Sequence, residues 1–190
     1  MAVWAGKDVA GFCGAVKKIN QNGVDLVPVA VFRIVAHPIV IVGDDRGMLI
    51  DGEICPSADS KEEIIPVEWY GKKVYILEAE GIYEVRLPKV EIPKTATGFC
   101  YPRSSFARLG VIKSQTAVFD SGYVGEGSQT FHFPAKAIIG VDEAWVQMVF
   151  VDNKTEAEKL YDGKYQGEKV KSITSEQVRR LAGDARQRKD

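Results

Sequence analysis

The alternation of apolar and polar positions predicts a chain built mostly of β-strands. Stretches rich in valine, isoleucine and aromatic residues alternate in part with polar positions, and turn-forming residues separate them. Short strands joined by frequent turns are typical of a β-sandwich or a jelly-roll-like barrel. The pattern therefore predicts an all-β fold of this type, with strands over Leu26–Val35, Val74–Leu77, Ile82–Leu87 and Trp145–Val151.

Helical periodicity is found in the carboxy-terminal tail. Thr174 to Gln177 carries a helix-capping signal, and Val178 and Leu181 share one face of the helix that would follow. The tail is basic and polar. We expect one β domain over residues 1–172 and a short helical tail over residues 173–190.

Two polar segments interrupt the predicted strands. Asp44–Gly47 and Pro56–Glu63 contain residues such as Asp, Gly, Pro and Ser, which favour turns and loops. We expect the first segment to be a turn and the second a loop, both inserted between strands.

Charge and hydrophobicity exclude two classes of partner. The formal net charge of the 190-residue chain is -1, whereas proteins that bind nucleic acid through its phosphates carry a basic excess. The longest apolar runs, such as Val27–Val35 and Ile39–Val42, are too short to cross a bilayer, and no signal stretch opens the chain. We therefore expect no nucleic-acid partner, no membrane partner and a cytoplasmic location.

Cysteine and histidine usage does not indicate a metal site. Cys13, Cys55 and Cys100 are odd in number and scattered, so we expect reduced, partly buried, small apolar residues. The chain lacks the His-x-Glu and Pro-Cys-x-x-Cys pattern with which zinc deaminases activate water. His37 and His132 are expected to be packing or surface residues. We assign no protein metal ligand.

One candidate site is the segment Tyr101-Pro-Arg-Ser-Ser-Phe-Ala-Arg-Leu-Gly110. Arg103 supplies a fork of N–H donors that matches phosphate oxygens, and the hydroxyl groups of Ser104 and Ser105 add further donors. Together these groups can hold a polyphosphate chain. Taken alone, an Arg-Ser-Ser run is more often a solvated turn.

A second candidate site is the segment Phe119-Asp-Ser-Gly-Tyr-Val-Gly-Glu126. The glycines predict a β-hairpin whose mouth carries the carboxylate of Asp120, and they allow its backbone to approach a ligand closely. Near a phosphate site, such a carboxylate can orient or deprotonate a water that hydrolyses a phosphoanhydride. Taken alone, Asp-Ser-Gly is usually only a turn.

The order, spacing and flanks of the two segments together resemble the trimeric dUTPase and dCTP deaminase superfamily. In that superfamily a Pro-Arg-Ser-Ser block precedes an Asp-x-x-Tyr-x-Gly hairpin. Asn22–Leu26 and Gly140–Gln147 are similar to two further blocks, and Tyr161–Gly167 is similar to the closing segment of the deaminases. The resemblance covers the chain from about residue 20 to about residue 172.

The resemblance implies a distorted jelly roll, a homotrimer with sites between subunits, and hydrolysis of dUTP to dUMP and pyrophosphate. Asp120 would activate the water that attacks the α-phosphorus. Tyr123 would stack under the deoxyribose and exclude a 2′-hydroxyl. Backbone groups from Asp120 to Gly125, including Gly122, would read uracil, because their donors and acceptors mismatch the amino edge of cytosine.

The phosphates would be bound by another group of residues. By resemblance, Arg103, Ser104 and Ser105 contact the phosphates, and Gln147 contributes an amide. Arg108 would reach either a phosphate or the neighbouring subunit. Asp25 would either position metal-bound water or support the site. Mg²⁺ is expected as the cofactor, held mainly by phosphate oxygens and waters.

The closing segment has two interpretations. Tyr161, Tyr165 and Gln166 either fold over bound nucleotide as a lid with glycine hinges, or pack on the barrel. The resemblance favours the lid, above all for Tyr165 and Gln166.

Position 130 separates the members of the superfamily. Deaminases that resemble this chain carry a catalytic Glu ten positions beyond the hairpin Asp, where this chain has Thr130, which cannot activate water as a carboxylate does. Glu126 lies four strand residues away, or roughly 13 Å. Pro102 and the Gly-Glu of the hairpin follow the dUTPases, whereas Arg108 and the closing segment follow the deaminases, a mixture that resembles archaeal dUTPases.

We therefore predict a dUTP diphosphatase. The alternative is a dCTP deaminase or a bifunctional deaminase and dUTPase, which would release ammonia from dCTP. A nucleotide-binding protein without catalysis is a third hypothesis, and an intact Asp120 beside an intact Arg103-Ser-Ser block argues against it.

Overall fold

The fold is almost entirely β. The structure, a computed structural model, describes residues 2–35, 37–42, 45–55, 61–114, 118–163 and 165–167. Within them lie seventeen strands and two short helices, so the predicted all-β class is confirmed. The predicted helical tail, 173–190, lies outside the described residues.

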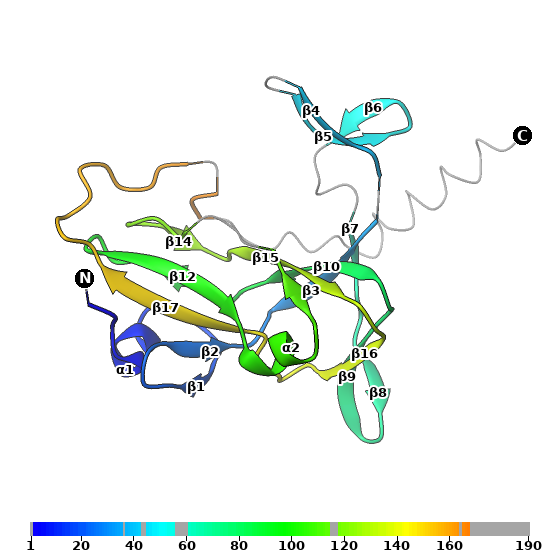
Figure 1. Cartoon of the computed structure of the whole chain (residues 1–190), viewed down its shortest axis with the longest axis horizontal. Helices are drawn as coiled ribbons and strands as arrows, with labels where there is room; N and C mark the ends of the chain where they lie inside the picture. Colours follow the sequence, from blue (N-terminus) through cyan, green and yellow to red (C-terminus); the bar gives the residue numbers. More distant parts are fainter. Residues whose placement is uncertain are drawn as a thin grey trace, which may run out of the picture.

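Two antiparallel sheets form the body (Figure 1). The first has the order β1-β2-β17-β12, with bounds Val16–Ile19, Val24–Leu26, Val146–Asp152 and Ala96–Pro102. The second has the order β13-β15-β10-β3-β7, with bounds Ile112–Lys113, Ser128–Phe133, Gly81–Arg86, Ala30–Ile34 and Lys61–Glu63.

Three smaller sheets and two helices complete the described chain. The sheets are β16-β9-β8 (Ala137–Gly140, Lys72–Leu77, Val67–Trp69), β11-β14 (Val90–Glu91, Val124–Gly125) and β4-β5-β6 (Ile39–Val42, Asp45–Ile50, Glu53–Cys55). The helices are α1 (Gly6–Ala10) and α2 (Ser104–Arg108). None of these sheets closes into a barrel among the described strands.

Each predicted strand overlaps an observed one, but the first is divided. The run Leu26–Val35 ends β2 in one sheet and supplies β3 to the other. Between them, the Val27 amide donates to the Ala15 carbonyl and the Val29 amide donates to the Arg86 carbonyl. The chain therefore crosses from sheet to sheet, and an apolar run carries no signal of that crossing.

The predicted turn at Asp44–Gly47 is wrong where it is described, because residues 45–47 belong to β5. A side chain added at Gly47 would place its Cβ 2.3 Å from the carbonyl oxygen of Cys55 on β6. The glycine thus permits close approach of two strands rather than a turn. The predicted loop Pro56–Glu63 is also wrong in part, since residues 61–63 form β7 and 56–60 lie outside the described residues.

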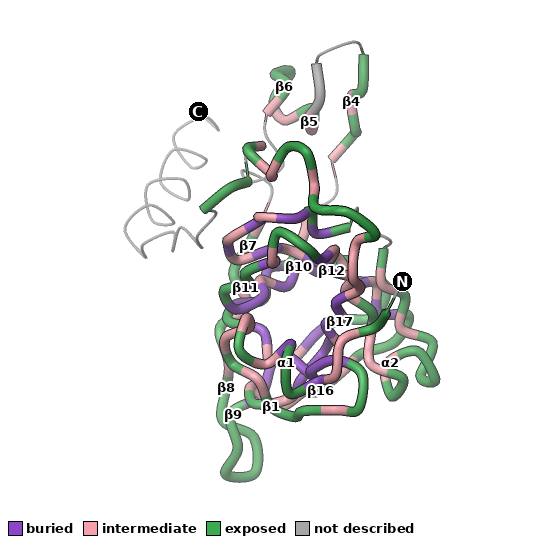
Figure 2. Tube along the Cα trace, turned by 90° about the vertical axis from the view of Figure 1, so that its left-hand side faces the viewer, coloured by how far each residue is buried: buried purple, intermediate pink, exposed green. Residues whose placement is uncertain are grey.

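A continuous apolar core joins the two body sheets (Figure 2). Its centre is Trp145, fully buried, whose ring lies 5.5 Å from Phe106 and 5.6 Å from both Phe131 and Phe133. Aromatic pairs at such distances add to the stabilisation from burial. The core therefore fixes the start of β17 and helix α2 against the second sheet.

The cysteines are unpaired and partly buried, as predicted. Burial raises the pKa of the Cys13 and Cys100 thiols to about 12. Both thiols therefore stay protonated near neutral pH and pack as small apolar groups.

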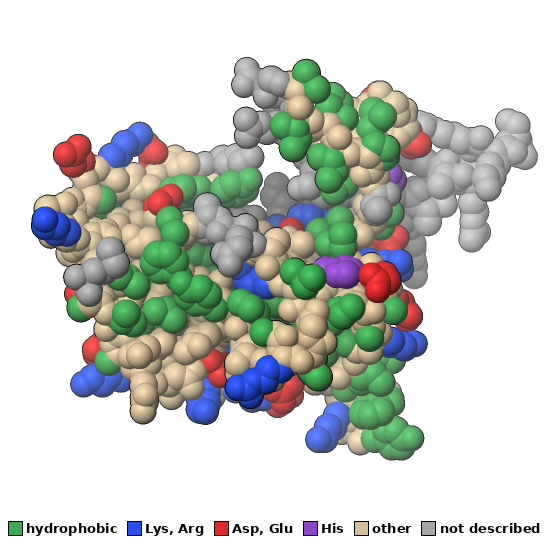
Figure 3. All heavy atoms as spheres, viewed as in Figure 1, with side chains coloured by type: hydrophobic (Ala, Val, Ile, Leu, Met, Phe, Trp, Pro, Cys, Tyr) green, Lys and Arg blue, Asp and Glu red, His purple; other side chains and the backbone are tan. Residues whose placement is uncertain are grey.

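The β4-β5-β6 sheet projects from the body and is less buried than it (Figures 1 and 3). Ile39 and Ile41 are each 71% exposed, and Val42 is 69% exposed. In the described part of the chain, no helix has the length and apolar character that a membrane span requires.

Gly23 offers a test of the backbone that leads into β2. It has φ +107°, and a Cβ there would lie 2.2 Å from the Met148 carbonyl, whereas Gly52 has φ +87° and open space around it. We expect Gly52→Ala to cost about 1 kcal/mol from backbone strain, and Gly23→Ala to cost roughly 3 kcal/mol or more. Urea unfolding at one protein concentration measures both, and equal midpoints would contradict the close approach.

Candidate functional site

The predicted phosphate-binding residues gather at one end of the first sheet. Asp25 lies on β2 opposite Gln147 on β17, and Arg103 directly follows β12. The Arg103 Nε lies 3.0 Å from the Asp25 Oδ2. The structure thus brings together three residues that lie far apart in the sequence.

Asp25 is held in place by hydrogen bonds as well as by charge. Only 5% of the residue is exposed, and its Oδ1 accepts a hydrogen bond of 2.7 Å from the Asn20 side chain. A buried carboxylate is stable when it is paired and hydrogen-bonded in this way. This geometry shows Asp25 supporting Arg103, in agreement with the supporting role that the sequence left open.

Arg103 retains capacity for an anion. Its Nη1 donates to the Ala144 carbonyl at 3.3 Å and lies 3.9 Å from the Glu143 carboxylate. A guanidinium has five N–H donors, so it can hold Asp25 and a phosphate together. Its side chain is 30% exposed. Ser104, Ser105 and Arg108 are exposed on α2.

Gln147 has its carboxamide at the same end of the sheet. Its Nε2 donates to the Asn22 carbonyl at 3.1 Å. The alternation of β17 buries Val146 and Met148 and turns Gln147 outward. Arg103 and Gln147 therefore lie at the same end of the first sheet, beside Asp25.

Asp120 lies in a second cluster, around the predicted hairpin. Asp120 is exposed, whereas the next residue, Ser121, is buried and held by hydrogen bonds. The Ser121 hydroxyl donates to the Ala96 carbonyl at 2.7 Å and accepts from Asn153 Nδ2 at 2.8 Å. The Thr97 hydroxyl donates to Asn153 Oδ1 at 2.8 Å. This chain of hydrogen bonds fixes the turn that carries Asp120. No motif or periodicity pointed to Asn153 or Thr97.

Tyr123 is buried in this cluster rather than open to solvent. It is 5% exposed, and its ring lies 5.3 Å from Phe119 and 5.6 Å from Tyr161, edge to face. Gly122 has φ +83°, and a Cβ there would lie 3.0 Å from Leu160. Within its own chain, the Tyr123 ring is therefore held between Phe119 and Tyr161 and largely shielded from solvent.

The closing segment is docked on the hairpin of its own chain. The Tyr161 amide donates to the Ser121 carbonyl at 2.9 Å, and the Gln166 side chain bonds the backbone of Gly122 and Val124. Tyr165 is 49% exposed. Lys164 lies outside the described residues.

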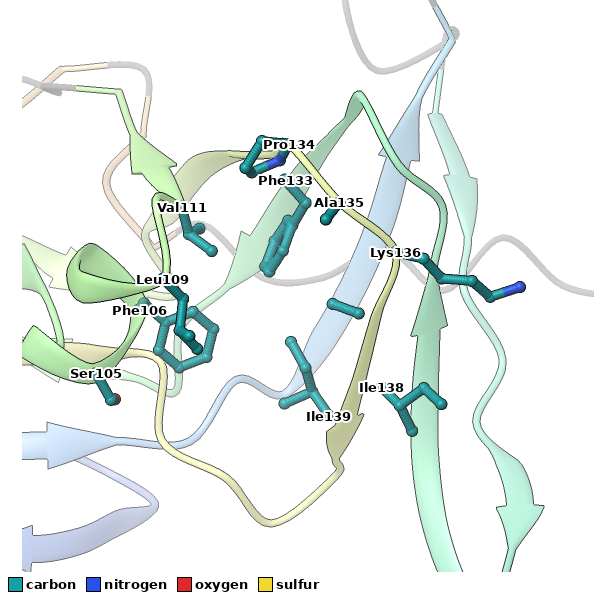
Figure 4. A pocket seen from close by; sticks show the side chains of 11 residues that line it. Ser105, Phe106, Leu109, Val111, Phe133, Pro134, Ala135, Lys136, Ile138 and Ile139 are labelled. Carbon is teal, nitrogen blue, oxygen red and sulfur yellow. The ribbon is translucent and has the colours of Figure 1, made fainter.

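Two cavities lie near the two clusters. One of about 340 Å³ borders the hairpin and is lined mainly by polar groups, among them Thr97, Asp120, Asn153 and Lys159. The other, of about 360 Å³, lies beside Ser105 and is lined mainly by apolar side chains such as Phe106, Leu109 and Ile139 (Figure 4). The cavity beside the hairpin suits a polar ligand and a water, whereas the cavity beside Ser105 does not.

The two clusters lie at opposite ends of β12 (Figure 1). Phe119 bridges Gly98, which places Asp120 near Thr97, while Arg103 follows the other end of the strand. Six strand residues span about 20 Å. One triphosphate therefore cannot contact both Arg103 and Asp120 of the same chain.

Thr130 faces a carboxylate that sequence reasoning missed. It lies on β15 directly opposite Glu84 of β10, so both side chains stand on one face of the sheet. Glu84 is 6% exposed, and its oxygens lie 2.5 Å from Lys61 Nζ and 2.8 Å from Arg86 Nε. The sequence signal for Glu84 was an acidic residue inside an otherwise apolar predicted strand.

Metal ligands are sparse in the described ranges. No group of three or more His, Cys, Asp or Glu side chains there is placed to hold a metal ion. Mg²⁺ keeps several waters and takes one or two carboxylates plus substrate phosphates, so this donor set fits an ion that arrives with a nucleotide.

Most of the length of the chain is similar to known proteins. Residues 13–152 match the family model described as dCTP deaminase-like. A probable deoxyuridine 5′-triphosphate nucleotidohydrolase of Halobacterium salinarum is 31% identical over 156 residues, covering 80% of this chain and 86% of the relative. A dCTP deaminase of Metallosphaera sedula is 33% identical over 108 residues, covering 54% of this chain and 60% of the relative.

A solved structure shares the fold. The 2′-deoxycytidine 5′-triphosphate deaminase from Agrobacterium tumefaciens superposes with a TM-score of 0.53 at 15% identity, over 78% of this chain and 48% of that chain. The chain thus spans about half the length of that deaminase.

The Asp25–Arg103 pair yields a stability prediction. Asp25→Asn removes the charge that faces Arg103 in a buried position, and we expect a loss of about 1–3 kcal/mol. Asp142→Asn is the matched control, because the Asp142 side chain is 82% exposed and its contact with Lys17 is 3.5 Å long. Its effect should stay within about 0.5 kcal/mol. Urea unfolding of both variants decides, and similar midpoints would show that Asp25 is not a structural anchor.

Proposed function

The chain belongs to the dCTP deaminase-like family, and from that premise we propose that it hydrolyses dUTP to dUMP and pyrophosphate. The observation that carries the proposal is the place of Asp120, whose carboxylate borders a polar cavity at an anchored turn. The names of relatives such as the Halobacterium salinarum protein support the same activity.

The site would be shared between subunits. The Arg103 cluster and Asp120 are separated by about 20 Å along one strand. In the homotrimer that the resemblance implies, Asp25, Arg103 and Gln147 of one subunit would face Asp120 and Tyr123 of a neighbour. Arg108, exposed at the end of α2, would reach either the phosphates or that neighbour.

Asp120 would act as general base. It takes a proton from water as the water oxygen attacks the α-phosphorus, the bond between that phosphorus and the bridging oxygen breaks, and pyrophosphate leaves. Because Asp120 is exposed and Ser121 is buried and hydrogen-bonded, the carboxylate is open to water while its backbone is fixed.

Arg103, Ser104 and Ser105 would bind the phosphates, with the amide of Gln147 beside them. Arg103 has the strongest structural support, since Asp25 orients its guanidinium at 3.0 Å. A bound Mg²⁺ would neutralise charge on the phosphates. Asp25, although already paired with Arg103, is the carboxylate nearest these donors and would meet waters of that ion.

The hairpin would read the sugar and the base. Backbone groups of the hairpin would match the carbonyl and N3–H edge of uracil, at positions other than the Gly122 carbonyl and the Val124 amide, which Gln166 already bonds. Tyr123 would stack under the deoxyribose and exclude a 2′-hydroxyl, with Phe119 and Tyr161 fixing the ring plane. A free nucleotide as substrate implies action in the cytoplasm.

Deamination of dCTP is less well supported by the geometry. At position 130 the chain has a hydroxyl, and the carboxylate opposite, Glu84, is held by Lys61 and Arg86. Both oxygens of the Glu84 carboxylate are therefore engaged by cations. The same arrangement disfavours the bifunctional alternative.

Removal of the base should separate binding from chemistry. We expect Asp120→Asn to bind the imido analogue of dUTP within a few-fold of the parent, and to lose about 10³-fold or more in kcat. Pyrophosphate and ammonia release from dUTP and dCTP are followed together. Asp51→Asn is the control, because Asp51 has φ +50°, which Asn tolerates. Full activity of Asp120→Asn, or ammonia from dCTP, would contradict the proposal.

A shared site predicts complementation. Arg103→Ala and Asp120→Asn should each be inactive alone, whereas isolated trimers that contain both variant chains should recover about a third of parental activity, since one of the three interfaces in each joins an intact Arg103 to an intact Asp120. Co-expression with two affinity tags isolates the mixed oligomers, and native mass spectrometry confirms them. Mixed oligomers without activity would place the whole site in one chain.

A further inference from the structure

Gln166 lies where it can control the shape of the Asp120 hairpin. We propose that it is a positioning residue whose side-chain amide holds the turn over residues 121–124 in the form that receives the nucleotide. This inference rests on the proposed function and adds to it a residue that acts through the hairpin backbone. Its first test needs no turnover.

The contacts of Gln166 are paired and local. Its Oε1 accepts from the Val124 amide at 3.0 Å, and its Nε2 donates to the Gly122 carbonyl at 2.9 Å. The next amide, of Gly167, donates to the Val124 carbonyl at 2.7 Å. A carboxamide carries a donor and an acceptor side by side, so it can bridge these two backbone groups, which bracket Tyr123.

The turn needs such a brace because its own secondary structure is short. The β11-β14 sheet consists of two residue pairs, Val90↔Gly125 and Glu91↔Val124. Two-stranded pairings of this kind are marginal by themselves. Ile92 adds two backbone hydrogen bonds, from the Gly122 amide and to the Tyr123 carbonyl, and Gln166 and Gly167 add three more.

The rest of the closing segment supports the same turn from beside it. The Tyr161 amide donates to the Ser121 carbonyl at 2.9 Å, and its ring packs on Tyr123. Leu160 fills the space over Gly122, where a Cβ would lie 3.0 Å away. The segment and the hairpin thus form one packed unit within one chain.

This arrangement gives Gln166 a role different from that of a lid. The carboxamide atoms that bond Gly122 and Val124 cannot bond a phosphate at the same time. A lid must also move between open and closed states, whereas the proposed brace stays in place when nucleotide binds. The two mechanisms therefore predict opposite behaviour of the Val124 amide.

The experiment combines hydrogen exchange with kinetics on the full chain. Gln166→Met keeps the length of the side chain and removes both hydrogen bonds. In the absence of nucleotide, exchange at the Val124 amide should rise about 10- to 30-fold, as for the loss of two net hydrogen bonds. KM for dUTP should rise about 10-fold with kcat within about 3-fold, and discrimination against UTP should fall, because Tyr123 is bracketed by the lost contacts.

Glu158→Ala is the matched control, because Glu158 is exposed shortly before the closing segment. This variant should leave both the Val124 exchange and the kinetics of dUTP hydrolysis unchanged. Unaltered Val124 exchange in Gln166→Met would overturn the proposal. Faster Val124 exchange in the parent on addition of the imido analogue of dUTP would also overturn it, because nucleotide would then displace Gln166. A parent chain without dUTP hydrolysis would refute the proposed function, while the exchange data would still decide whether Gln166 braces the turn.

Discussion

The ladder between β12 and β17 is the constraint on which the site depends. It runs without a register shift from Ala96↔Asp152 to Pro102↔Val146. A paired strand advances about 3.3 Å per residue and cannot contract, so the ladder fixes the distance between the hairpin at one end and Arg103 at the other. No side-chain rotation within one chain can close that gap. The site shared between subunits that we propose would bring the two ends of this ladder to one triphosphate.

Strands β12 and β17 contribute side chains to the apolar core from one face and to the candidate site from the other. On β17, Val146 and Met148 are fully buried, and Gln147 between them faces outward beside Asp25. Trp145, just before the strand, anchors it among aromatic rings, and its carbonyl accepts the Arg103 amide at 3.0 Å. Packing of the core thus orients Arg103 and Gln147 directly. Substitutions in the core are therefore expected to disturb the candidate site as well.

The sequence predicted elements and motifs better than their connections. Alternation located four spans that overlap strands, because local patterns carry that signal. The family resemblance assigned Arg103 and Gln147 to the phosphates and left Asp25 with either a supporting or a water-positioning role. The crossing between sheets within Leu26–Val35 and the strand role of Gly47 depend on distant partners and were missed. So were Asn153, which bonds Ser121 across 32 positions, and Lys61, which reaches Glu84 from another strand.

The Arg103 cluster and the turn that carries Asp120 are held in place by different contacts, and this difference bears on the proposed function. Arg103 is built on a seven-residue ladder and an ion pair with a buried carboxylate. Asp120 sits on a turn defined by two residue pairs, a hydroxyl chain and the closing segment. Regions with few ladder bonds open at low free-energy cost. The phosphate half is therefore the fixed frame, and the shape of the hairpin half, which would discriminate base and sugar, depends on how firmly its braces hold.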